Sequence, residues 1–186
     1  MKKPGLIVSL LVSLILLASV LSAQAAPSLQ GYTGLVLIPN ADTLDEKDYN
    51  VGFFTLNLEE GADEDIWTGN LGVDEGMELG VTRFKPEDGE SETLLNAKYR
   101  IRTEEDQKPG LAVGIFDATD ELDTTVYLVM SKTVPDLITS GDKEIFAPRI
   151  HVGVGGGQLS GFFGGLSFGL GDNLMLMAEY LSLIHI

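Results

Sequence analysis

The residues that could carry nucleophilic chemistry are few. His151 is the one histidine outside the last six residues, and Ser160 and Ser167 are hydroxyl residues on its C-terminal side. A hydrolase acting on lipids would need these groups to converge with an orienting carboxylate or amide. A single histidine in a strand more often has a structural role, and 28 acidic residues form many accidental pairs resembling a glycosidase site. The pattern names no catalytic residue, so we expect no enzyme activity.

Clustered carboxylates could form a metal site, because calcium prefers several oxygen ligands. None of the clusters has the twelve-residue spacing of an EF-hand loop. We therefore interpret them as solvated loop residues and expect neither a metal nor a cofactor. The clusters lie at residues 59–65, 87–92 and 117–123.

The glycine-rich run at residues 152–171 imitates two other motifs. It holds no G-x-G-x-x-G or G-x-x-x-x-G-K-[ST] spacing, so it predicts no phosphate-binding loop. Its 20 uncharged residues could span a membrane as a helix, but nine of them are glycine, which disfavours helix. We interpret the run as a glycine-rich hairpin.

Strands are the elements that must position these residues, because short runs of alternating apolar and polar residues recur from residue 49 onward. The alternation predicts eight strands and long first and fifth connections, at residues 59–76 and 134–147. A further strand at residues 31–38 would invert the assignment of the connections. The predicted strands are residues 49–58, 77–84, 93–102, 111–118, 124–133, 148–155, 161–170 and 174–180.

Five charged residues occupy the polar faces of three predicted strands. The period of two puts Lys98, Arg100 and Arg102 on the same face of one strand. Glu78 and Glu179 lie on the polar faces of two others, where their carboxylates would oppose these cations in a closed sheet. We predict a charge network in the interior, formed by Glu78, Lys98, Arg100, Arg102 and Glu179.

Two all-β architectures could produce this alternation: a soluble sandwich with its apolar face inward, or a membrane barrel with its apolar face toward lipid. Several runs approach the about 9 to 11 residues that a tilted strand needs to cross a bilayer. The opposite face is rich in Gly, Ser, Thr and ionisable residues, which suits a narrow polar interior. Aromatic residues near strand ends are typical of interfacial girdles. They are Tyr49, Phe84, Tyr99, Phe146 and Tyr180.

The first 25 residues predict a secretory signal. Lys2 and Lys3 precede an apolar stretch at residues 6–21, and Ala23-Gln24-Ala25 is a small-residue cleavage site. The alternative is a membrane anchor of about 16 to 18 residues. The signal predicts export, and the absence of cysteine excludes disulfides, zinc–thiolate sites and thiol nucleophiles.

Charge and hydropathy narrow the class of partner. The net charge of -16 argues against nucleic acid, since binding phosphates requires clustered Lys and Arg. A hydrophobic content of 44% argues against a disordered chain.

The last six residues, 181–186, match the translation of a transposase end sequence from library preparation. We expect a non-native tail there and a barrel incomplete at its C-terminal end, with a native terminus as the alternative.

Several short motifs, in this order and spacing, resemble the YjbH-like family of outer-membrane β-barrel proteins. They are GYTGL at residues 31–35, IPNA at 38–41, LAVGIFD at 111–117, YLVMSK at 127–132 and GLSFGLGDNLMLMAEY at 165–180. The resemblance implies a bacterium with two membranes and a role in exopolysaccharide biosynthesis and secretion. It supplies no catalytic residues.

These observations combine into one interpretation. We expect a signal peptide at residues 1–25, an N-terminal segment at 26–48, and an antiparallel up-and-down outer-membrane β-barrel of about eight or more strands at 49–180. Its expected partners are outer-membrane lipid and polysaccharide or polysaccharide-export proteins. The expected role is structural, as an accessory to exopolysaccharide biosynthesis or secretion. The alternative is a soluble periplasmic or secreted β-sandwich that binds carbohydrate through Trp67 and nearby loop acids.

Overall fold

The computed structural model describes seven stretches of the chain. They are residues 26–56, 64–86, 89–134, 138–140, 143–146, 148–169 and 175–182. The predicted signal peptide and residues 183–186 of the predicted tail lie outside these stretches.

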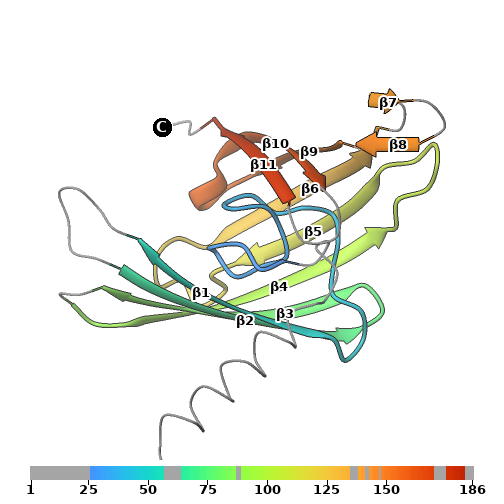
Figure 1. Ribbon diagram of the computed structural model, residues 1–186. Coiled ribbons are helices and arrows are strands. Elements are labelled where there is room, and N and C mark those ends of the chain that lie inside the picture. Colours follow the sequence, from blue (N-terminus) through green and yellow to red (C-terminus); the bar gives the residue numbers. More distant parts are fainter. Residues whose placement is uncertain are drawn as a thin grey trace, which may run out of the picture.

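Nine of the strands form one antiparallel sheet in which each strand pairs with its neighbours along the chain, in the order β1-β2-β3-β4-β5-β6-β9-β10-β11. A two-stranded sheet of β7 and β8 interrupts the chain between β6 and β9. In the described part of the chain the sheet is not closed, and β1 and β11 are its two edges (Figure 1). The bounds are β1 Tyr49–Leu56, β2 Glu64–Asp74, β3 Met77–Pro86, β4 Glu92–Arg102, β5 Gly110–Phe116, β6 Thr125–Thr133, β7 Ile138–Ser140, β8 Lys143–Phe146, β9 Arg149–Gly155, β10 Gly161–Gly169 and β11 Met175–Leu181.

The all-β antiparallel up-and-down arrangement is confirmed, but the predicted long first connection is wrong. Residues 59–76 contain strand β2, which pairs with β1 on one side and β3 on the other. Its polar residues Thr68 and Asn70 lie on the buried face, while Trp67 and Leu71 are exposed. This strand was missed because acidic and glycine residues flank a short apolar pattern. Residues 31–38 form no regular strand, only isolated bridges at Thr33 and Gly34.

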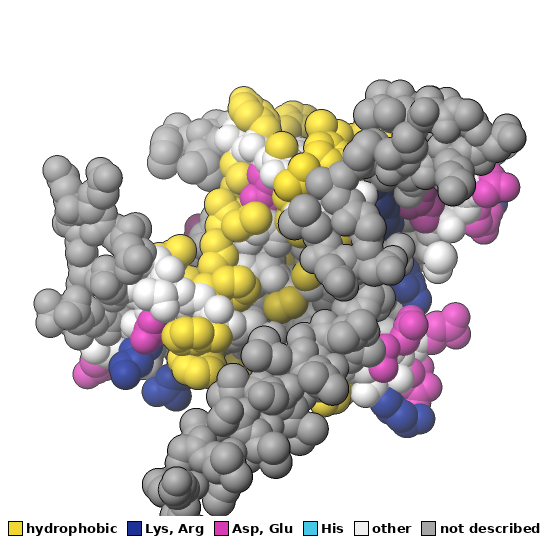
Figure 2. Space-filling view, in the orientation of Figure 1, with side chains coloured by type: hydrophobic (Ala, Val, Ile, Leu, Met, Phe, Trp, Pro, Cys, Tyr) yellow, Lys and Arg dark blue, Asp and Glu magenta, His cyan; other side chains and the backbone are white. Residues whose placement is uncertain are grey.

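Burial alternates along the strands and divides the sheet into an inner and an outer face. In β6, for example, Tyr127, Val129 and Ser131 are buried, whereas the intervening Val126 and Leu128 are exposed. In Figure 2 most visible charged side chains lie toward the left and right, where strands end, with hydrophobic side chains between them. The outer face is therefore apolar, and the inner face carries many polar side chains.

The N-terminal segment, residues 26–48, packs on the inner face, and the sheet curves around it (Figure 1). Its Tyr32 lies 5.9 Å from Phe116 and 5.4 Å from Tyr127, measured between ring centroids. The side chains of Leu35 and Ile38 approach Gly165 so closely that a Cβ there would lie 2.8 and 2.9 Å from them. Glycine on the inner face thus makes room for the segment.

No helix in the described part of the chain is long and apolar enough to cross a membrane.

Candidate functional site

Buried polar side chains of the sheet meet the backbone of the N-terminal segment on the inner face. Glu78, on β3, is buried, and its carboxylate accepts the N–H of Thr33 at 2.9 Å and the N–H of Leu44 at 3.1 Å. The Thr33 hydroxyl also donates to it. Lys98, paired with Glu78 across β3 and β4, donates to the Thr33 carbonyl at 2.5 Å. An irregular segment cannot pair its own backbone groups, so the sheet's side chains satisfy them.

Further contacts of the same kind hold the rest of the segment. The Gln30 carbonyl accepts hydrogen bonds from the Thr82 hydroxyl at 2.8 Å and the Asn96 amide at 3.2 Å. Glu179, on β11, accepts the N–H groups of Leu37 and Ile38 at 3.0 to 3.1 Å. The segment is thus bound to strands from the middle of the sheet and to its β11 edge.

A second polar group, which we call the rim cluster, consists of Asp42, Glu104, Lys132 and Arg149. It lies at the end of the sheet where β4 turns into β5 and where β9 begins. The Arg149 guanidinium donates to both carboxylate oxygens of Asp42, and its Nε donates to Glu104 at 3.0 Å. The Lys132 ammonium donates to Glu104 at 3.2 Å. Arg149 therefore joins the N-terminal segment to the β4–β5 connection.

Electrostatics keep Glu104 ionised within this cluster. Partial burial raises the pKa of its carboxyl, but hydrogen bonds from the Thr133 N–H and the Lys132 ammonium, together with the Arg149 charge, outweigh that effect. The pKa consequently lies below its usual value. The Glu104 carboxylate is the fixed anion that orients Arg149 toward Asp42.

His151 lies buried on the inner face between two serines. Its Nδ1 is 2.8 Å from the Ser131 hydroxyl and its Nε2 is 3.0 Å from the Ser167 hydroxyl. The N–H of Ala41 donates to Ser131 at 2.9 Å. Both imidazole nitrogens contact hydroxyls, so no carboxylate orients the ring as a hydrolase would need. Ser160 instead follows the short 3-10 helix at Gly157–Leu159.

The five charged residues expected to form one network are brought together only in part. Glu78 and Lys98 are adjacent, and Glu179 contacts the N-terminal segment from β11. Arg100 and Arg102 are half-buried near the end of β4, where the Arg102 guanidinium donates to the Pro109 carbonyl at 2.9 Å. Among the described residues, the ion pairs connect other side chains.

Asp117 organises the connection between β5 and β6. Its carboxylate accepts the N–H groups of Glu121, Leu122 and Asp123 at 2.7 to 3.1 Å and the Thr119 hydroxyl at 2.8 Å. Burial raises the pKa of this carboxyl, but the hydrogen bonds have the larger, opposite effect. The pKa therefore lies below its usual value. No group of three or more His, Asp or Glu residues in the described stretches is arranged to hold a metal. Residues 59–63, 87 and 88 of the acidic clusters lie outside them.

Several residues of the site were missed by sequence reasoning, because their partners are distant in the chain. Asp42 and Arg149 are 107 residues apart, and Thr33 and Glu78 are 45 apart. The irregular N-terminal segment carries no periodicity that would fix its position on the sheet. The GYTGL and IPNA motifs at residues 31–35 and 38–41 were the available signal, since they hold Thr33 and Ile38.

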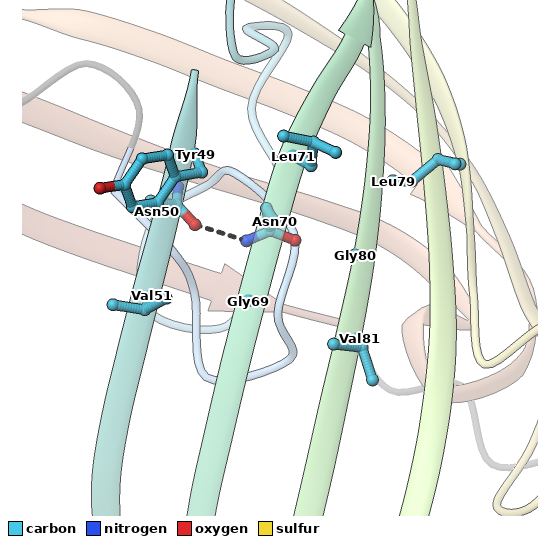
Figure 3. Close-up of a pocket in the computed structure, with 9 residues that line it drawn as sticks. All are labelled: Tyr49, Asn50, Val51, Gly69, Asn70, Leu71, Leu79, Gly80 and Val81. Atoms are coloured by element: carbon cyan, nitrogen blue, oxygen red, sulfur yellow. Dashed lines mark hydrogen bonds between the residues drawn. The ribbon is translucent and has the colours of Figure 1, made fainter. Parts of the chain in front are cut away.

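A shallow hollow of about 270 Å³ lies on the outer face over β1 to β3 (Figure 3). It opens above Gly69, where a Cβ would meet only the Val81 side chain, at 3.9 Å. Beneath it, Asn70 donates to Asn50 at 2.7 Å. The surrounding residues are mostly apolar: Tyr49, Val51, Leu71, Leu79 and Val81. The hollow offers few polar groups to a ligand.

Comparison with known proteins adds no relative: no protein family, no curated protein and no solved structure matches this chain.

Proposed function

We propose that this protein is an outer-membrane β-barrel protein whose outer face contacts lipid. The observation that carries the proposal is the exposure of large apolar side chains along the outer face. Of these, Val51 is 73% exposed, Phe162 is 72% exposed and Tyr180 is 69% exposed. Soluble monomers rarely expose contiguous apolar patches of more than a few hundred Å². Lipid tails accept such a face, whereas water does not.

The outer apolar residues line up across strands. A continuous row runs from β3 to β10 through residues that pair directly with one another. On β4 the apolar outer positions extend from Leu95 to Ile101, which is about 20 Å along the strand at about 3.3 Å per residue. With strands tilted by about 40°, that length covers about 15 Å of the about 25 Å apolar band of outer-membrane barrels. The row consists of Met77, Tyr99, Val113, Leu128, Val154 and Phe162.

Charged residues border this apolar band. On β3, the outer positions change from Leu79 and Val81 to Arg83 and Lys85, all four of which are exposed. On β6, the exposed Val126, Leu128 and Met130 are followed by Lys132. An apolar stretch ended by cations at the strand terminus fits a bilayer core bordered by headgroups.

The polar inner face also favours a barrel over a sandwich. A sandwich buries the apolar faces of its sheets against each other. In this chain the buried face holds Glu78, Lys98 and Asn96. Trp67, the proposed carbohydrate-binding residue of the sandwich, lies on the outer face, where its ring packs against Phe53 at 4.4 Å. Not all predicted girdle aromatics face outward, because Phe84 packs against the inner core.

Closure into a barrel belongs to the proposal, because the nine-stranded sheet is open. With nine alternating strands, β1 and β11 run in the same direction. An all-antiparallel closure therefore takes an odd number of additional strands between them. Even totals are the rule in bacterial single-chain barrels.

A role as an accessory to exopolysaccharide biosynthesis or secretion rests on the resemblance of the short motifs alone. On that basis we propose polysaccharide or polysaccharide-export proteins as partners and a structural, non-catalytic role. The pairing of both His151 nitrogens with hydroxyls supports the absence of hydrolase chemistry.

Fractionation of cells that express the full chain tests the membrane proposal. We expect the protein to sediment with outer membranes and to migrate differently on a gel before and after heating, as folded barrels do. Release of the protein into the soluble periplasmic fraction, with heat-independent migration, would reject the barrel and favour the carbohydrate-binding sandwich.

A further inference from the structure

The N-terminal segment runs through the interior from one end of the sheet to the other. Gln30 lies near the β9–β10 connection, where its amide contacts Gln158 at 3.4 Å. Asp42 lies at the opposite end, in the rim cluster. Between these points the segment packs along the curved inner face. In a closed barrel it would occupy the interior.

The inner face under the segment carries polar side chains beside the apolar core that packs against the segment. Among the described residues, the Thr68 hydroxyl and the Asn70 side-chain oxygen are buried without a hydrogen-bond partner. Buried polar atoms normally have partners, and water is the usual one where protein supplies none. An interior that water enters after the segment leaves would satisfy these atoms. The polar inner residues include Thr68, Asn70, Thr82, Asn96, Ser131 and Ser167.

The segment's attachment at the rim is accessible to solvent. The Arg149 and Asp42 side chains are 17% and 25% exposed, so water and salt reach the ion pair that joins them. Such a pair is weakened by salt more than one that is fully buried. The attachment at Glu78 is buried and uses three hydrogen bonds to the segment. Release would therefore begin at the rim cluster.

We propose that the N-terminal segment is a releasable plug, and that its release opens a polar passage for ions and small hydrophilic solutes. This passage rests on the proposed membrane function and goes beyond the structural role given above. The Asp42–Arg149 pair holds the plug at the rim, and Glu104 orients Arg149 for that contact.

Breaking the rim attachment gives the first part of the test. The full chain is inserted into planar bilayers, and its conductance is measured in potassium chloride. Asp42→Asn is expected to raise the open fraction about tenfold, as for loss of a partly buried ion pair. The matched control is Asp45→Asn, which neutralises an exposed carboxylate of the same segment and is expected to leave the conductance unchanged.

A reversible crosslink gives the second part. A Cβ at Gly110 would lie 3.3 Å from the Cβ of Ala41, close to the about 3.5 to 4.5 Å of a disulfide. The chain has no cysteine, so Ala41→Cys with Gly110→Cys introduces a single pair. Added to Asp42→Asn, the oxidised pair is expected to abolish the increased conductance and reduction to restore it. Ala41→Cys alone should show no redox effect.

The outcomes separate the plug from the membrane proposal. Insertion is measured independently, by protection of the strands from added protease. A chain that inserts but conducts equally in the oxidised and reduced states, at the wild-type level, overturns the plug and leaves the membrane proposal standing. A chain that does not insert overturns both.

Discussion

Replacing one apolar residue of the band with arginine tests whether the outer face contacts lipid or water, because the loss of stability differs between the two. Leu128 lies in the middle of the band: it pairs with Val113 on β5 and Val154 on β9, between Val126 and Met130 on its own strand. An arginine near the bilayer midplane costs a barrel about 2 to 4 kcal/mol, which lowers the ratio of folded to unfolded protein about 30-fold to 1,000-fold. Because Leu128 is already 41% exposed, the same change on a face in water should cost less than about 0.5 kcal/mol.

The assay is urea unfolding of the full chain in phospholipid vesicles, for wild type and Leu128→Arg. Leu122→Arg is the matched control, because Leu122 is 45% exposed but lies in the β5–β6 connection, outside the band. We expect a loss of about 2 to 4 kcal/mol for the first variant and less than about 0.5 kcal/mol for the second. Equal and small effects of both substitutions would refute the argument that the band faces lipid.

Three further predictions concern carboxyl groups that accept several hydrogen bonds. Glu78→Gln should lower the free energy of unfolding by about 2 to 3 kcal/mol, because one of the two oxygens that accept the N–H groups of Thr33 and Leu44 becomes an amide nitrogen that cannot accept them; the exposed Glu75→Gln should change it little, and equal effects would contradict the role of Glu78. The Glu104 pKa is depressed in the fold, so its stabilising contribution is present above its unfolded pKa of about 4.3 and disappears as pH falls through the lower folded value. The difference in urea midpoint between wild type and Glu104→Gln should therefore shrink from pH 6 to pH 3, and a constant difference would be evidence against this ionisation. Asp117→Asn should loosen the β5–β6 connection and cost about 1 to 3 kcal/mol, since three backbone N–H groups lose a charged acceptor; limited proteolysis should cut this connection faster than in Asp123→Asn, and identical cleavage would argue against it.

The strands were predictable where one face is uniformly apolar. In β4 the alternation of Leu95, Ala97, Tyr99 and Ile101 with polar residues predicts both the strand and its outward face, as found. In β2 the outer positions include Gly69, and the inner positions mix the apolar Ile66 with the polar Thr68 and Asn70, so neither face gives a clear apolar pattern. That strand is held by pairing with β1 and β3, which a single-sequence pattern does not contain.

The candidate site was predictable only for neighbouring strands. The alternation puts Glu78 and Lys98 on polar faces, and the register of β3 with β4 makes them direct partners. Their contacts with Thr33 depend on where an irregular segment settles against the sheet. The position of the N-terminal segment follows from its packing and from the hydrogen bonds of its backbone groups. Neither produces a periodic pattern in the sequence.

Quenching of the single tryptophan tests most directly whether the outer face meets lipid. Trp67 is 55% exposed on that face, and it pairs with Arg83 near the border of the apolar band. In vesicles, lipids brominated near the headgroup end of their acyl chains are expected to quench its fluorescence strongly, while aqueous iodide has little effect. Strong quenching by iodide with none by the brominated lipids would contradict a membrane-embedded sheet.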